Sequence, residues 1–250
     1  MNTTVATTPE NTWLDRSLGD LARSVPGATA VFFRHGLDFC CGGKTSLREA
    51  LDNKGLDAGP LVDELSAMRD DHDQTAANWR DASSNQLIDH ILARFHERHR
   101  QQLPELIRLS RRVEMVHADR PECPHGLADH LEDMFQELES HMQKEEQILF
   151  PLLRNGVPPM DLPPVSVMRY EHVQHGEALA RMAALAHGFE QPRGACNTWR
   201  ALLAGLYALR EDLMLHIHLE NNLLFEGLTR SESDIACGCG GGAADCSRST

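Results

Sequence analysis

The chain has 250 residues, of which 41% are hydrophobic and 24% are charged, which is ordinary for a globular protein. This length allows one large domain or two modest ones, each able to bury a hydrophobic core. The formal net charge is -13, so the acidic surface would repel a phosphate backbone. Nucleic acid is therefore excluded as an expected partner.

The N-terminus and the hydropathy of the chain indicate a cytoplasmic location. The opening segment, MNTTVATTPENT, has no basic residue and no apolar stretch, so it does not have the pattern of a secretory signal. The sequence contains no run of about 18 apolar residues, which is the length needed to span a bilayer. Seven cysteines in a reducing compartment indicate metal binding, redox chemistry or packing rather than structural disulfides.

Residues 12–70 predict a small helical domain. Short apolar clusters in this part of the chain are interrupted repeatedly by glycine and proline, which is the pattern of three or four short helices. The polar stretch at 71–83 predicts a linker to the rest of the chain.

Residues 84–230 predict four long helices packed as a bundle. The first begins at a cap at Ser83 or Ser84, and Pro104 is expected to kink it. The segment PPMDLPP before the third helix is expected to be non-helical. The remaining helices are expected from about Gly126 to Pro151, from Val165 to Gly188 and from Asn197 to Leu224. No alternating strand pattern competes, so the predicted fold class is all-α.

Two of these helices carry a histidine and a glutamate four residues apart, namely His141 with Glu145 and His216 with Glu220. Four residues turn a helix by about 400° and raise it by about 6 Å, so each pair points from one face. Both pairs lie among apolar residues that place them near the core, where an unpartnered ionisable group is costly. A metal ion explains the two pairs better than two solvated helix faces.

Each of the other two helices is expected to supply one imidazole at the same depth. His172 lies about two turns into the third helix, and His96 directly follows the apolar run of the first. His99, one turn beyond His96, is the rival ligand. Four imidazoles and two carboxylates suit two iron ions bridged by the carboxylates, whereas zinc would be satisfied by about four ligands.

Several ionisable residues near these positions are expected outside the ligand set. Glu146 is expected to point about 100° away from Glu145. Glu137 and Glu171 are expected to line an access path or to hydrogen-bond to the imidazoles, with plain solvation as the alternative. His175 and His218 are expected at the surface or beside the ligands. His117 is expected to lie too far along the first helix to reach the site.

The motif DFCCGGK places two cysteines before two glycines. A disulfide between adjacent cysteines is strained and readily reduced, and two thiols alone do not complete a four-cysteine metal site. Gly42 and Gly43 are expected to turn the backbone sharply and leave the thiols exposed, and Lys44 would favour a thiolate. We therefore predict that Cys40 and Cys41 are reactive or iron-transfer thiols, with a purely structural role as the alternative.

The remaining cysteines have no comparable motif. Cys123 lies in an expected turn and Cys196 at the start of the last helix, so both are interpreted as incidental. The glycine-rich segment 231–250 predicts a flexible tail. Its three thiols could chelate iron or form mixed disulfides, and their role stays open: Cys237, Cys239 and Cys246.

Together, the motifs DFCCGGK, FHERHRQQLPEL, VEMVHAD, SHMQKEEQILFP, SVMRYEH and HIHLENNLLF resemble the di-iron iron–sulfur cluster repair family, the group of YtfE, ScdA, NorA and DnrN. The likeness covers about residues 12–228. It implies an N-terminal domain with the Cys-Cys-Gly-Gly motif joined to a hemerythrin-like four-helix bundle. It also implies an oxo- and carboxylate-bridged di-iron centre held by His96, His141, Glu145, His172, His216 and Glu220.

The resemblance further implies a stress-response role in restoring iron–sulfur clusters damaged by nitric oxide or peroxide. The implied partners are damaged iron–sulfur proteins and nitric oxide, and a homodimer is implied by the resemblance alone. Reduction of nitric oxide at the di-iron site, and service as a nitric oxide sink or sensor, are the alternatives.

One position departs from the oxygen-carrying hemerythrins, which resemble this bundle. They add a second histidine four residues after the first on the third helix, where this chain has Gly176. The missing ligand is expected to leave the irons less tightly held and more open. This favours iron release or nitric oxide binding over oxygen storage.

Overall fold

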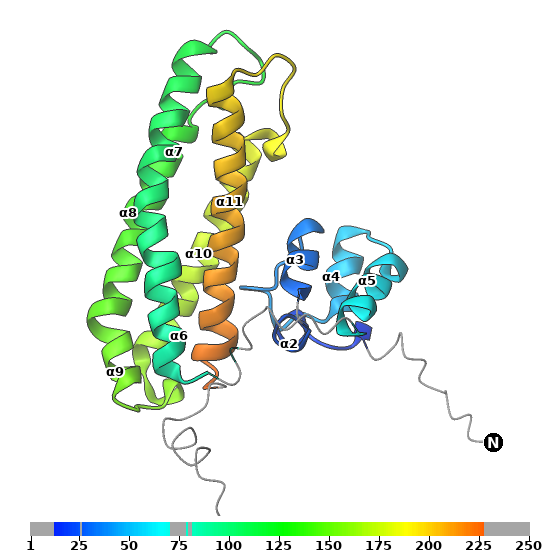
Figure 1. Ribbon diagram of the computed structural model, residues 1–250, viewed down its shortest axis with the longest axis vertical. Helices are drawn as coiled ribbons and strands as arrows, with labels where there is room; N and C mark the ends of the chain where they lie inside the picture. The colour runs from blue at the N-terminus through cyan, green and yellow to red at the C-terminus, as the bar shows by residue number, and fades with distance from the viewer. Residues whose placement is uncertain (1–12, 26, 71–78, 80–81, 228–250) are drawn as a thin grey trace, which may run out of the picture.

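The computed structural model describes residues 13–25, 27–70, 79 and 82–227, and their regular elements are helices (Figure 1). The predicted all-α fold, with short N-terminal helices followed by a helical bundle, is confirmed. The predicted tail at 231–250 and most of the predicted linker lie outside the described residues. None of the described helices combines the length and the hydropathy needed to cross a bilayer.

Four short helices are named among the described residues of the N-terminal part: α2 (Leu18–Ser24), α3 (Ala28–Arg34), α4 (Leu47–Lys54) and α5 (Ala58–Asp70). Two of them begin at serines whose hydroxyls accept a backbone N–H, Ser17 from Asp20 and Ser46 from Glu49. Apolar side chains from all four helices are buried together, including Leu21, Phe32, Leu47 and Leu65. These contacts make the short helices one packed unit.

The first rod of the bundle consists of α6 (Ser84–Ile91), η1 (Leu92–His96) and α7 (Glu97–Val116). Ser83 is its cap: its side chain accepts the N–H of Gln86, and the Gln86 side chain accepts the N–H of Ser83. Pro104 lies inside α7, which continues to Val116.

The second rod contains α8 (Leu127–Lys144), η2 (Glu145–Leu149) and α9 (Phe150–Arg154), and the third is α10 (Pro163–Leu185). Between them, η3 (Pro159–Asp161) is a 3-10 turn, and Pro163 opens α10. The expectation that PPMDLPP is non-helical was therefore wrong. Proline is tolerated in the first turn of a helix, where its missing N–H would have no partner.

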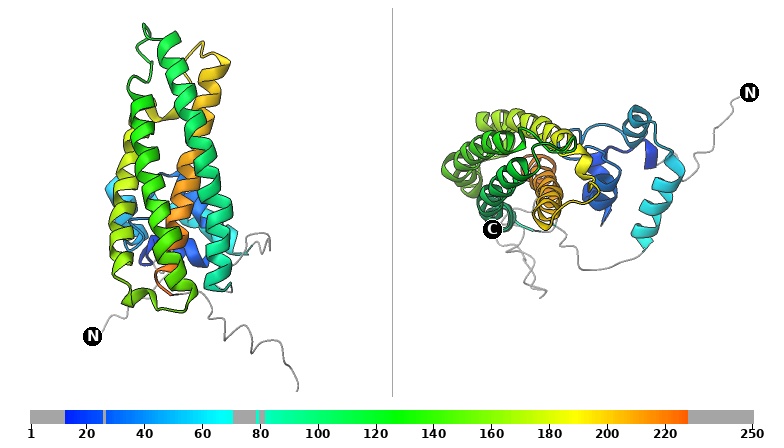
Figure 2. Two further views of the ribbon diagram at one scale, coloured as in Figure 1. Left: turned by 90° about the vertical axis from the view of Figure 1, so that its left-hand side faces the viewer. Right: turned by 90° about the horizontal axis from the view of Figure 1, so that it is seen from above.

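The fourth rod is α11 (Asn197–Leu219) followed by η5 (Glu220–Leu224), and η4 (His187–Phe189) precedes it. The small domain packs on one side of the bundle, beside this rod (Figures 1 and 2). Arg23 donates to the backbone oxygen of Asn222 at 3.1 Å, and the rings of Phe33 and Tyr207 meet edge to face with centroids 5.0 Å apart.

Two apolar clusters divide the bundle along its length. One surrounds the N-terminal half of the first rod and the C-terminal end of the fourth, and includes Ile91, Phe95 and Leu223. The other fills the opposite part and includes Leu103 and Leu206. Between these clusters the helices present buried histidines and glutamates, so a polar layer crosses the core.

Candidate di-metal site

Six side chains from the four rods converge in this polar layer. They form two overlapping groups, one of His96, Glu145, His216 and Glu220, the other of His141, Glu145, His172 and Glu220. In each group the donor atoms lie within 4.8 Å of one another. Both glutamates belong to both groups, which is the arrangement that two bridged ions require. The six are those that helical spacing singled out, and His99 lies in neither group.

The donor atoms fit a pair of cations. His96 Nε2 lies 3.2 Å from His216 Nε2, and His141 Nε2 lies 3.1 Å from His172 Nε2. A hydrogen bond between two such nitrogens needs a single shared proton. Two nitrogens bound to one cation, each at about 2.1 Å, are also about 3 Å apart. Both separations therefore match two nitrogens that bind one cation. Neither carboxylate oxygen of the buried Glu145 has a hydrogen-bond partner, and each lies 3.4 Å from an imidazole Nε2, of His96 or of His141. A cation bound among these atoms would satisfy the buried carboxylate.

Hydrogen bonds at Nδ1 orient three of the four imidazoles. Each bond fixes the ring so that the Nε2 lone pair faces the site. His96 donates to Glu146 Oε1 at 2.8 Å, His141 to Glu171 Oε2 at 2.8 Å and His172 to Asn221 Oδ1 at 2.9 Å. Imidazole and carboxylate donors in this arrangement suit iron.

Charge acts on the donors in opposite directions: it favours the ligating carboxylate of Glu145 and the protonated, non-ligating form of His141. Burial opposes ionisation of Glu145, but the adjacent His141 and His96 outweigh it and hold the pKa of its carboxyl well below the usual range. Burial likewise opposes protonation of His141, but Glu145 and Glu220 raise its pKa to about 9. A bound cation would take over the role of these imidazolium charges.

Glu146 lies outside both donor groups, as expected, but it contacts a ligand imidazole. The rotation of about 100° from Glu145 aims its side chain at the first rod rather than at solvent. There it accepts from His96 and lies 2.9 Å from Arg100 Nη1. Glu171, one of the two residues expected to hold an imidazole or to line an access path, hydrogen-bonds to His141.

Three π-helical turns surround the site. η1 ends at His96, η2 begins at Glu145 and η5 begins at Glu220. Single π turns within α-helices are frequent at functional sites. Neither propensity nor hydrophobic period signals such a turn, so sequence reasoning missed all three.

Three further buried histidines lie next to the ligand groups or the small domain. The ring of His175 packs against His141 with centroids 4.9 Å apart, that of His99 against His216 at 5.4 Å, and that of His218 against Phe39 at 5.5 Å. A surface position for His175 and His218, one of the two alternatives expected, is therefore wrong. Burial lowers the pKa of His175 to about 3 and that of His218 to about 4, so both are neutral.

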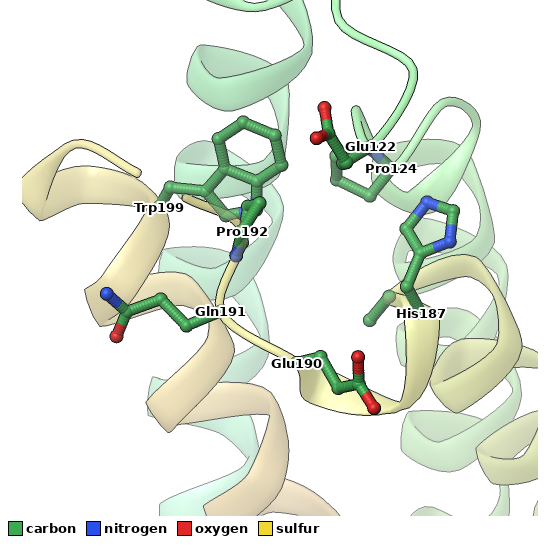
Figure 3. Close-up of a pocket in the computed structure, with 8 residues that line it drawn as sticks. Glu122, Pro124, His187, Glu190, Gln191, Pro192 and Trp199 are labelled. Atoms are coloured by element: carbon green, nitrogen blue, oxygen red, sulfur yellow. The ribbon is translucent and has the colours of Figure 1, made fainter. Parts of the chain in front are cut away.

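Two of the hollows on the described surface of the bundle differ in their relation to the site. The first, of about 300 Å³, is next to the site and is lined by Glu137, Glu171 and His175 among others. The second, of about 190 Å³, lies near the loop between α10 and α11 and is lined by side chains that include His187 and Trp199 (Figure 3). None of the six converging residues lines the second hollow.

The Cys-Cys motif lies against the bundle. Cys41 Sγ donates to the backbone oxygen of His172 at 3.2 Å, and Asn221 Nδ2 donates to the backbone oxygen of Cys40 at 3.1 Å. Cys40 is only 4% exposed. Contact with the Cys41 thiol, burial and the Asp38 carboxylate raise the pKa of Cys40 well above its usual value. The expectation of an exposed pair with a favoured thiolate was therefore wrong for Cys40.

Comparison with known proteins agrees with both parts of this architecture. Residues 87–228 match the family described as "Hemerythrin HHE cation binding domain", and residues 14–69 match ScdA_N, a "Domain of Unknown function (DUF542)". The iron-sulfur cluster repair protein YtfE of Pectobacterium carotovorum subsp. carotovorum is 47% identical over 221 residues, 87% of this chain and 98% of the relative. The YtfE proteins of Musicola paradisiaca and Yersinia pseudotuberculosis are 47% identical over 219 residues and 45% over 218, covering 88% and 87% of this chain and 98% of each relative.

The chain belongs to the YtfE family of iron–sulfur cluster repair proteins. Its hemerythrin-type cation site, with two buried His/Glu groups, indicates a di-iron centre. The predicted family and cofactor are thus confirmed.

The two glycines of the motif in this YtfE family member let neighbouring atoms pack closely against the backbone. A Cβ at Gly42 would lie 2.9 Å from the backbone oxygen of Asp38, and one at Gly43 would lie 2.7 Å from Asn222 Oδ1. Neither glycine has the positive φ that a left-handed turn requires. The expectation that they leave the thiols uncovered was wrong for Cys40, because Gly43 allows the loop to seat against η5 and Gly42 allows it to fold closely over Asp38.

Replacing Gly43 by alanine is expected to push the loop away from η5 and to destabilise the protein by about 1–3 kcal/mol, as overpacking does. Gly59→Ala is the matched control, because the nearest atom to its added Cβ, Asp57 Oδ1, is 3.7 Å away. Urea unfolding and thiol labelling of Cys40 check this result. Equal stability and equal labelling in both variants would contradict the assigned role of Gly43.

The structure of this YtfE family member also explains why position 176 is glycine rather than histidine. A Cβ at Gly176 would lie 3.5 Å from Cys41 Sγ, so the thiol occupies the space beside that position. A histidine there would meet Cys41.

Proposed function

We propose that this chain repairs damaged iron–sulfur clusters by supplying iron from its bundle, and that it binds nitric oxide at the same site. The observation that carries the proposal is the pair of buried His/Glu groups that share Glu145 and Glu220. The name of the YtfE relatives, iron-sulfur cluster repair proteins, supports it. Damaged iron–sulfur proteins are the proposed partners and the cytoplasm the proposed location.

We assign the six converging residues as the iron ligands. Glu145 and Glu220 would bridge the ions, His96 and His216 would hold one, and His141 and His172 the other. Iron held by these residues would supply the cargo for repair and would bind a small ligand such as nitric oxide. Protein residues control its release, because each imidazole that loses iron must gain a proton or another partner.

The hollow beside His141 is the proposed route for that exchange. Glu171 accepts from His141 Nδ1 and is also paired with Lys144, whose side chain is 43% exposed. This chain of contacts links a ligand imidazole to solvent. Glu137, at the wall of the same hollow, would attract a departing cation.

Iron-loaded protein is expected to reactivate a nitric-oxide-damaged iron–sulfur enzyme in proportion to the iron it delivers. The measurement follows enzyme activity and the iron left on the chain, with the Glu145→Ala variant as control. Many turnovers of nitric oxide per chain with a reductant would instead establish catalysis. Tight nitric oxide binding without reactivation or turnover would establish a sink, and either result would overturn the proposal.

A further inference from the structure

A third group of metal-binding side chains lies outside the bundle core. Donor atoms of Asp38, Cys40 and Cys41 lie within 4.8 Å of one another. The two sulfur atoms are 3.7 Å apart, and Cys40 Sγ is 3.2 Å from Asp38 Oδ1. The group is distinct from the two His/Glu groups and shares no residue with them.

The sulfur separation matches that of two thiolates on one ion. Thiolates bound tetrahedrally at about 2.3 Å are about 3.8 Å apart. The 3.7 Å separation therefore lets both sulfurs reach one cation without rearrangement of the loop. Asp38 shapes the loop for this, since its Oδ1 accepts the backbone N–H of Cys40 at 3.2 Å and that of Cys41 at 2.9 Å.

The three donors bring negative charge together in a small space. The Asp38 carboxylate lies 3.2 Å from the Cys40 sulfur, and Cys40 is buried. Lys44, the nearest lysine in the sequence, is exposed. A divalent cation would offset this charge, because a bound metal stabilises thiolates and carboxylate together.

The group also lies at the edge of the proposed di-iron site. Cys41 Sγ contacts the backbone of His172, and Asn221 joins the His172 imidazole to the backbone of Cys40. An ion leaving the half of the site held by His172 has these thiols as neighbouring donors. Soft thiolates compete with imidazole and carboxylate for such an ion.

We propose that Asp38, Cys40 and Cys41 form a separate, mononuclear site for a thiophilic divalent cation, and that in the cell it receives iron(II) from the bundle before transfer to a client. The proposal rests on the proposed function of iron supply and names the residues of the transfer step. Binding exchanges ligands only: two thiols release two protons to solvent, two metal–sulfur bonds form, and no electron is transferred.

Cobalt(II) is the probe, because thiolate ligands give it a charge-transfer absorption that histidine and carboxylate ligands do not. The full chain is used with Cys237, Cys239 and Cys246 replaced by serine, so that the tail contributes no thiol. Titration is expected to give a thiolate absorption that saturates at one ion per chain. It should vanish in Cys40→Ser/Cys41→Ser and persist in Cys123→Ser/Cys196→Ser.

The Asp38→Asn variant keeps the acceptor for the two backbone N–H groups and removes the charge. It is expected to weaken the thiolate-bound cobalt by about 10-fold or more, the usual effect of altering the immediate support of a metal site. Circular dichroism and the cobalt absorption of the bundle report whether each variant is folded. A folded chain without the thiolate absorption, or one whose absorption survives loss of both cysteines, overturns the proposal.

The transfer role has its own measurement. Iron-loaded Cys41→Ser protein is expected to keep its bundle iron and to deliver it to an apo acceptor more slowly than the parent chain. Delivery at the parent rate would overturn the transfer site while leaving iron supply intact. A bundle that holds no iron in the parent chain would instead refute the proposed function itself.

Discussion

Replacing Glu145 or Glu220 by alanine is expected to remove both iron ions, whereas replacing His96 by alanine is expected to remove mainly one. Each glutamate belongs to both donor groups, so its loss leaves both groups one donor short. His96 belongs to a single group, and the group of His141 and His172 would keep all its donors. Metal content per chain and the absorption of the di-iron centre measure the difference.

Glu137→Ala is the control for this comparison. Glu137 lines the hollow beside the site but belongs to neither donor group. It should retain both ions, with any effect confined to the rate of exchange. Loss of one ion from Glu145→Ala, or of both from His96→Ala, would contradict the bridging assignment of the glutamates.

Asn221→Ala is expected to weaken the metal site and to loosen the small domain together. Its Oδ1 accepts from His172 Nδ1, and its Nδ2 donates to the Cys40 backbone oxygen. Loss of a group that orients a ligand imidazole lowers metal affinity by about 10–100-fold. The unpaired buried groups left behind would lower the free energy of unfolding by about 1–3 kcal/mol. Competition with a chelator and urea unfolding measure the two effects.

Two neighbouring substitutions separate these effects. Asn222→Ala removes the donor to the Phe39 backbone oxygen and leaves the His172 bond in place. It should therefore lower stability without lowering metal affinity. Asn221→Asp keeps the acceptor for His172 and loses the donor to Cys40, so it should retain metal. If Asn222→Ala lost as much metal affinity as Asn221→Ala, domain docking rather than imidazole orientation would be the cause.

Features that repeat along one helix could be predicted from the sequence. The spacing of His141 and Glu145 fixes their shared face, because α-helical geometry is the same in every helix. His96 could be distinguished from His99 because it directly follows the apolar run that ends at Phe95. The four rods and the two His/Glu groups follow from such local regularities.

Features that depend on two distant segments could not be predicted in this way. Glu146 reaches His96 across 50 residues of sequence, and Cys41 reaches His172 across 131. Helical period gives the direction of a side chain but not the neighbour it meets. The buried position of Cys40 depends on how the small domain docks on the bundle, for which the motif DFCCGGK carries no local signal.

The position of Cys41 beside Gly176 depends on how the small domain docks on the bundle. A histidine at 176 would be a permanent part of its helix, whereas Cys41 is held there by noncovalent contacts between two parts of one chain. Its local concentration at the site is that of a tethered partner. The contact is therefore a docking equilibrium, and a surface that competes for Asn221 and Asn222 would move Cys41 away from the third rod.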